Sequence, residues 1–189
     1  MERKVPIGLS NKHIHVSQAD LEVLFGKGYE LTPMKDLSQP GQYASEEKLD
    51  IVGPKSTIKG VRILGPVRPE TQVELSIGDG FSLGIKAPLR NSGDTAGSPG
   101  LKLVGPAGEV EIDHGAIVAA RHIHMSPEEG DAFGLKDKDV VSVKLDGPRG
   151  LIFDNVLVRV NPNFRLDMHL DVEEGNAAGA HNGQMATIL

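Results

Sequence analysis

The sequence contains no cysteine and no tryptophan, only two tyrosines, and aromatic residues make up 4% of it. Without thiols the chain can form no disulfide and offers no thiolate ligand, so any metal ion must be bound by histidine, aspartate or glutamate. The few aromatic side chains and the formal net charge of −6 argue against nucleic-acid binding, which needs stacking surfaces and a basic face. These absences exclude a disulfide framework and argue against a nucleic-acid partner.

Long apolar runs are also missing. No segment approaches the roughly 20 apolar residues that span a bilayer, so we expect no membrane partner. The first residues include Arg3 and Lys4 and contain no apolar stretch typical of a secretory signal. We therefore expect a cytoplasmic protein. Its 189 residues suffice for one large domain or two small ones, each with a buried core.

A short internal repeat is the clearest feature that is present. Lys12–Ser17 reads Lys-His-Ile-His-Val-Ser, and Arg121–Ser126 reads Arg-His-Ile-His-Met-Ser. Each copy predicts a strand followed by a helix, because serine is a preferred N-cap and an acidic residue follows it three positions later. These acidic residues are Asp20 and Glu129, and Pro127 suits the first helical position of the second copy.

Most of the remaining sequence predicts short strands separated by turns. Four Gly-Pro pairs each follow a mostly apolar stretch and mark turns; they begin at Gly53, Gly65, Gly105 and Gly147. Apolar residues on both sides of Gly78–Gly80 predict two further strands around that turn. This spacing favours small β-barrels or a sandwich over alternating β-α units. The long loop at residues 88–100 is expected to border a site.

The histidines of the repeat are candidate metal ligands. Residues two apart in a strand share a face, so both histidines of each His-Ile-His segment point away from the apolar isoleucine between them. A third such segment, Leu166–Asp171, places His169 on the polar face as well. Imidazole pairs at this spacing can bind one zinc ion together. The alternative is a set of strand histidines that form hydrogen bonds at a surface.

Charged residues near these segments suggest a further carboxylate ligand and an anionic substrate. Glu74 lies on the strand face opposite Val73, where a solvated glutamate is the alternative to a metal ligand. Several basic residues lie in the first half of the chain. Arginine binds phosphate through two parallel hydrogen bonds, although any single basic residue is more often an exposed charge. The basic residues are Lys35, Lys55, Arg62, Arg68 and Arg90.

Several motifs occur in order over nearly the whole chain and together resemble the PduL-type phosphate propanoyltransferase (phosphotransacylase) family. They are Ser10–Ser17, Gly65–Arg68, Gln72–Glu74, Arg90–Asp94, Arg121–Ser126 and Asp167–Asp171. The resemblance implies a mainly β chain with two small β-barrels capped by short helices, assembled as a homodimer. Residues 1–50 and 120–189 would form the first, discontinuous barrel, and residues 51–119 the second.

The resemblance also implies a reaction and its residues. An acyl-CoA, propanoyl-CoA or acetyl-CoA, would react reversibly with inorganic phosphate to give acyl phosphate and coenzyme A at a dinuclear zinc site. Arg68 would be the catalytic, phosphate-binding arginine. Two Zn²⁺ per chain would be bound, one by His13, His15 and Glu74 and the other by His122, His124 and His169. Coenzyme A would be contacted by Ser10, Lys35, Lys55, Arg62 and Asn176.

Two other functions are compatible with the same histidines. A zinc hydrolase of an ester, amide or phosphate would use a zinc-bound water as its nucleophile. A non-catalytic protein could use zinc only to hold its barrels together. Family members that work inside microcompartments carry an N-terminal amphipathic extension, and the first motif here begins by Ser10. We therefore expect the chain to act in the cytoplasm.

Overall fold

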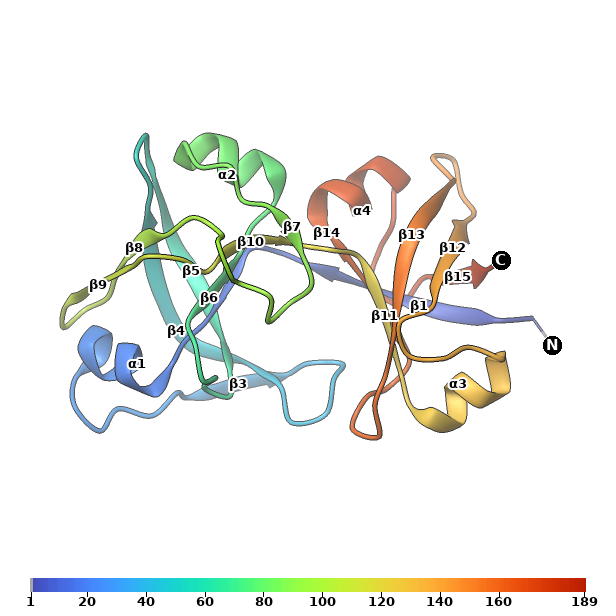
Figure 1. The fold of residues 1–189 in the computed structure, drawn as a ribbon, viewed down its shortest axis with the longest axis horizontal. Helices are drawn as coiled ribbons and strands as arrows, with labels where there is room; N and C mark the ends of the chain where they lie inside the picture. Colours follow the sequence, from blue (N-terminus) through green and yellow to red (C-terminus); the bar gives the residue numbers. More distant parts are fainter. Residues whose placement is uncertain (1) are drawn as a thin grey trace. The chain divides into compact units, whose positions relative to one another are not determined.

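The computed structural model describes residues 2–189 and is mainly β, as expected, with short helices packed on the strands (Figure 1). The described chain divides into two compact units. The first unit contains the residues through Asn11, together with Ser38–Pro40 and Ala120–Leu189. The second unit contains Lys12–Leu37 and Gly41–Ala119. Among the described residues, no helix has the length and apolar character needed to cross a membrane.

The first unit is a closed six-stranded barrel in the order β1-β14-β11-β13-β12-β15. Closure leaves no free sheet edge, and alternate residues of each strand point into the core. The core is built from side chains such as Val5, Ile123 and Met168, which are fully buried. The elements are β1 (Lys4–Ser10), β11 (His122–Met125), α3 (Pro127–Phe133), β12 (Val140–Leu145), β13 (Leu151–Val160), β14 (Asp167–Asp171), α4 (Val172–Ala178) and β15 (Met185–Ile188).

The second unit is a curled nine-stranded sheet in the order β7-β10-β6-β2-β5-β4-β8-β9, with β3 paired to β4. Its separate core includes Ile14, Ile63 and Val73. The elements are β2 (His13–His15), α1 (Gln18–Phe25), β3 (Pro33–Asp36), β4 (Tyr43–Val52), β5 (Thr57–Gly65), β6 (Gln72–Glu74), α2 (Ile77–Leu83), β7 (Leu89–Arg90), β8 (Leu101–Val104), β9 (Glu109–Ile112) and β10 (Ala116–Ala119).

This division differs from the expected one in the N-terminal fifty residues. Residues 12–37 and 41–50 lie in the second unit, whereas we expected them in the first barrel. The reason is strand pairing: β2 pairs with β5 and β6, and β4 pairs with β5 and β8. The first His-Ile-His segment therefore belongs to a different unit from the second.

The two units contain the same arrangement of three strands. In each unit, however, the first of these strands directly precedes, in the chain, a strand of the other unit. In the first unit β14 lies between β1, to which it is parallel, and β11, to which it is antiparallel. In the second unit β6 lies in the same way between β10 and β2. Yet β1 immediately precedes β2 in the chain, and β10 immediately precedes β11. Figure 1 shows the blue β1 among the orange and red strands of the C-terminal half.

The helices begin where capping residues predict. The side chain of Ser17 accepts a hydrogen bond from the backbone N–H of Asp20, and Ser126 forms a full capping box with Glu129. The prediction of two strands around Gly78–Gly80 was wrong, because this segment is helix α2. Ser76 and Asp79 form a capping box there, and this local signal outweighs the turn tendency of the glycines.

Loss of one cap should be measurable in the first unit. Ser126→Ala removes the acceptor for the Glu129 N–H and is expected to lower the free energy of unfolding by about 1 kcal/mol. Urea titration of the metal-free protein measures this change. Ser126→Asp keeps an acceptor at the N-cap and should stay close to the unsubstituted protein, whereas equal losses for both variants would contradict the capping role.

Candidate metal centres

One cluster of possible metal ligands lies in the second unit, where β2 and β6 pair side by side. His13 is the direct strand partner of Glu74. The Nε2 atoms of His13 and His15 lie 3.4 and 3.9 Å from the two carboxylate oxygens of Glu74. One ligand atom from each residue lies within 4.8 Å of those of the other two. His13, His15 and Glu74, here called the second-unit triad, therefore match the predicted ligand set.

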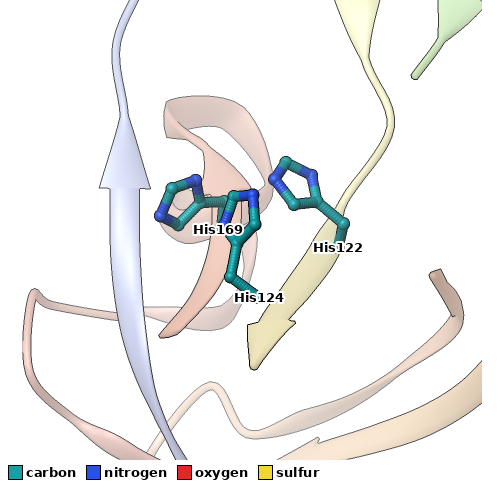
Figure 2. A group of neighbouring side chains, drawn as sticks. All are labelled: His122, His124 and His169. Atoms are coloured by element: carbon teal, nitrogen blue, oxygen red, sulfur yellow. The ribbon is translucent and has the colours of Figure 1, made fainter. Parts of the chain in front are cut away.

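The equivalent cluster lies in the first unit, where β11 and β14 pair. His122 is the direct strand partner of His169, as His13 is of Glu74. Figure 2 shows the three imidazole rings of His122, His124 and His169 gathered together, and their ligand atoms lie within 4.8 Å of one another. These residues, here called the first-unit triad, form the second predicted ligand set. A glutamate in one unit thus corresponds to a histidine in the other.

Hydrogen bonds to the backbone set the orientation of two of these histidines. His15 Nδ1 lies 3.1 Å from the carbonyl oxygen of Leu64, and His122 Nδ1 lies 2.8 Å from that of Ala120. A carbonyl can only accept, so Nδ1 carries the proton in both rings and Nε2 keeps its lone pair. This arrangement is typical of histidines that bind a metal through Nε2.

The protonation states in the second-unit triad also suit metal binding. Burial, followed by the charges of His13 and Arg68, lowers the pKa of His15 from 6.5 to about 3. Burial opposes ionisation of Glu74, but the charge of His13 and its hydrogen bond outweigh this and hold the pKa of Glu74 well below its usual range. Near neutral pH the triad therefore contains a neutral imidazole at His15 and a carboxylate at Glu74, which are the forms that bind a cation.

These pKa shifts predict that acid destabilises the metal-free protein. An unfolded chain takes up a proton at His15 near pH 6.5, whereas the folded chain does so only near pH 3. Between these values the unfolded state binds more protons, so the free energy of unfolding falls as pH falls, by up to about 1.4 kcal/mol per pH unit. Urea titrations of metal-free protein between pH 7 and 5 measure the slope.

The variant His15→Gln should reduce that pH dependence, because it removes the titrating group. His181→Gln is the matched control, since His181 is an exposed histidine outside both triads. A slope unchanged by His15→Gln would show that other groups cause the acid sensitivity.

Arg68 lies beside the second-unit triad. Its backbone N–H donates to the carbonyl oxygen of Val16 at 2.9 Å, which fixes the loop next to β2. Its Nη1 donates to Ser92 Oγ at 3.2 Å, and Ser92 Oγ donates to Glu74 Oε1 at 2.8 Å. Ser92 thus connects the guanidinium of Arg68 to the carboxylate of Glu74 through two hydrogen bonds. Ser92 comes from the long loop that we expected to border a site.

The five residues expected to contact coenzyme A are divided between the units. In the second unit, exposed Lys35 lies on β3, Lys55 Nζ lies 5.4 Å from the ring centre of Phe81, and Arg62 donates to the carbonyl oxygen of Ser45. In the first unit, Ser10 ends β1 and exposed Asn176 lies in α4. Their shared role in binding coenzyme A stays a prediction.

Sequence reasoning missed a pattern that marks the triads. In each of four places a triad residue stands two positions before the N-cap of a helix, and an acidic residue follows the N-cap three positions later. This signal, visible in the sequence, could have identified Glu74 and His169 without any resemblance. The four pairs are His15 with Ser17, Glu74 with Ser76, His124 with Ser126, and His169 with Asp171.

Comparisons with known proteins identify the family. The family model for phosphate propanoyltransferase matches residues 6–181. A phosphate propanoyltransferase of Thermotoga maritima is 52% identical over 99% of this chain and 91% of its own length. Proteins of the same name from Salmonella typhimurium and Clostridioides difficile are 52% and 48% identical; the matches cover 96% and 100% of this chain and 86% and 90% of theirs. The chain therefore belongs to the phosphate propanoyltransferase family.

Proposed function

We propose that this acyltransferase reversibly converts a short-chain acyl-CoA, propanoyl-CoA or acetyl-CoA, and inorganic phosphate into acyl phosphate and coenzyme A. The names of the relatives support the phosphate acyl transfer. The observation that carries the proposal is the chain of contacts from Arg68 through Ser92 to Glu74, which holds a guanidinium next to a group suited to bind a metal. Arginine and a metal ion together suit a phosphate dianion.

We further propose that each triad binds one zinc ion and that the two ions serve one reaction as a dinuclear site. The donor sets support zinc, because imidazole nitrogen and carboxylate oxygen are its ligands in proteins without cysteine. Three protein ligands in each triad leave a position for substrate, as in catalytic zinc sites. Bound zinc would supply Lewis-acid polarisation of the thioester carbonyl and a template for phosphate.

The chain's own residues would orient the nucleophile. Arg68 would neutralise phosphate and aim one of its oxygens at the carbonyl carbon, which lowers the entropic part of the barrier. A bond would then form between this oxygen and the carbonyl carbon, the carbon–sulfur bond would break, and the departing thiolate of coenzyme A would take up the proton that the phosphate loses. Because the chain has no cysteine, direct attack by phosphate is the simplest route. Trapping of a covalent acyl-enzyme would contradict direct attack.

Binding and assembly are proposed on the same basis. Ser10, Lys35, Lys55, Arg62 and Asn176 would contact coenzyme A, whose phosphate groups attract basic side chains. The chain would act as a homodimer, which sedimentation equilibrium tests directly. The cytoplasmic location stays a prediction.

The proposed reaction is tested by the products formed from propanoyl-CoA and acetyl-CoA. Release of free coenzyme A should require phosphate, and the acyl group should appear as acyl phosphate. A zinc hydrolase would instead release coenzyme A or another product without phosphate and give the free acid. Release at the same rate with and without phosphate would overturn the proposal in favour of the hydrolase.

A further inference from the structure

In each unit a buried polar side chain stands two residues before the third member of the triad, on the same strand. Gln72 precedes Glu74 on β6 and is 2% exposed, and Asp167 precedes His169 on β14 and is 6% exposed. Neither belongs to a predicted ligand set. Side chains two apart in a strand lie on the same face, so each is placed beside its triad member.

Gln72 and Asp167 also occupy the same place in the repeated arrangement. Gln72 is the direct partner of His15 where β6 pairs with β2. Asp167 is the direct partner of His124 where β14 pairs with β11. The two residues therefore correspond to each other as His15 corresponds to His124. Because Gln72 and Asp167 share a position but differ in chemistry, we expect them to play the same role toward two different triad members, Glu74 and His169.

Asp167 contacts the outer nitrogen of His169. Its Oδ2 lies 3.0 Å from His169 Nε2. In Figure 2 one ring nitrogen of His169 lies on the side of His122 and His124, and the other lies on the far side of the ring. A neutral imidazole has one N–H, and a carboxylate can only accept, so the proton belongs on Nε2. Nδ1 of His169 then keeps its lone pair for the triad.

The backbone of β1 holds this pair in place. Gly8 is the direct strand partner of His169 in the β1–β14 pair. A Cβ atom at Gly8 would lie 2.8 Å from Asp167 Oδ2 and 3.2 Å from His169 Cδ2. Asp167 and His169 thus pack directly against a strand that leaves no room for a side chain at this point. Gly8→Ala should push Asp167 out of position.

Gln72 contacts Glu74 with the opposite polarity. Its Nε2 donates to Glu74 Oε1 at 2.7 Å and to Ser92 Oγ at 3.0 Å. Its Oε1 accepts from the backbone N–H of Gly93 at 2.7 Å, which fixes the direction of the amide. The amide N–H therefore faces the carboxylate, and Glu74 is held with one oxygen bound and the other toward His13. The amide of Gln72 thus donates to the carboxylate of Glu74, whereas in the first unit the carboxylate of Asp167 accepts from the imidazole of His169.

We propose that Gln72 and Asp167 are positioning residues that orient the third metal ligand of their own units, Glu74 and His169. This inference rests on the proposed zinc sites. Hydrogen bonds of this kind raise metal affinity because they fix the tautomer and direction of a ligand before the ion binds. We expect His169 to bind through Nδ1, in contrast to the Nε2 ligand expected at His122.

The test measures zinc affinity in each unit separately, by competition with a chromophoric chelator. In the full chain, His13→Ala with His15→Ala leaves only the first-unit triad, and His122→Ala with His124→Ala leaves only the second. Asp167→Ala should weaken zinc binding by the first unit about 10- to 100-fold, and Gln72→Ala should weaken binding by the second to a similar extent. Neither change should affect the other unit. Glu47→Gln is the control, because Glu47 is a buried carboxylate bonded to Tyr29 and Thr32.

A spectroscopic measurement separates positioning from simple packing. ¹⁵N NMR of metal-free, histidine-labelled protein should show His169 protonated at Nε2, and Asp167→Ala should abolish this single tautomer; the zinc-loaded protein should show His169 bound through Nδ1. Asp167→Asn keeps an acceptor oxygen and should retain part of the affinity. If Asp167→Ala does not fold, Gly8→Ala provides a second test by displacing Asp167; because the added Cβ also approaches the ring of His169, this variant is judged by the tautomer of His169 together with the zinc affinity.

The outcomes distinguish this inference from the proposed function. If the unsubstituted chain binds no zinc, the zinc sites and the positioning roles both fail. If zinc binds but Asp167→Ala and Gln72→Ala leave its affinity unchanged, or His169 binds it through Nε2, only the positioning inference is overturned. Selective losses, each confined to one unit, would support it.

Discussion

His15→Ala is expected to reduce phosphate-dependent release of coenzyme A by about 1000-fold or more. His15 is 3% exposed and its Nε2 lies in the second-unit triad, so the substitution removes one of the three proposed ligands of that zinc ion. Loss of a Lewis acid costs several kcal/mol of transition-state stabilisation, and each 1.36 kcal/mol corresponds to a factor of ten in rate. Steady-state rates and metal analysis of the same sample measure both effects, and zinc content should fall from two ions to one.

The matched control is His114→Ala, which removes a half-exposed histidine from the same unit; His114 contacts Asp113 rather than either triad. Its activity and zinc content should equal those of the unsubstituted enzyme. If zinc merely held the unit together, His15→Ala would unfold it, and circular dichroism would show the loss. A folded His15→Ala variant with full activity would contradict a catalytic role for the second-unit triad.

Arg68→Ala is expected to lower kcat/KM for phosphate by about 100- to 1000-fold, the range seen when a donor that stabilises developing charge is removed. The guanidinium donates to Ser92 next to the triad, where we propose that it binds phosphate. KM for the acyl-CoA should change much less. Initial rates at varied phosphate and fixed acyl-CoA separate these two effects.

Arg68→Lys should recover only part of the loss, because an ammonium group lacks the planar pair of donors that binds phosphate at two points. Lys59→Ala is the charge control, since it removes an exposed positive charge from β5 in the same unit. Equal losses for phosphate and acyl-CoA in Arg68→Ala would indicate a general electrostatic effect. No loss at all would exclude Arg68 from phosphate binding.

Local signals in the sequence predicted local structure well. Strand alternation placed both histidines of each His-Ile-His segment on one face, and the capping residues Ser17 and Ser126 marked the helices that follow. The same reasoning failed at α2, where the glycines suggested a turn although Ser76 caps a helix. The exchange of β1 and β10 between the units could not be predicted, because long-range pairing leaves no periodic signal in one strand.

Different parts of the candidate site were predictable from different kinds of evidence. The histidine pairs followed from spacing, whereas Glu74 and Arg68 gained their proposed roles from the family resemblance. Strand alternation already placed Asp167 on the same face as His169, but the contacts of Gln72 with Glu74 and of Asp167 with His169 became visible only in the structure. Their position two residues before a ligand is a signal that can be sought in related chains.

The most direct test of the central claim is a zinc titration of metal-free enzyme, with phosphate-dependent release of coenzyme A from propanoyl-CoA measured at each point. The account predicts negligible activity without zinc and full activity when each chain holds two ions, with acyl phosphate as the product throughout. Full activity in protein shown by metal analysis to hold no zinc would contradict it.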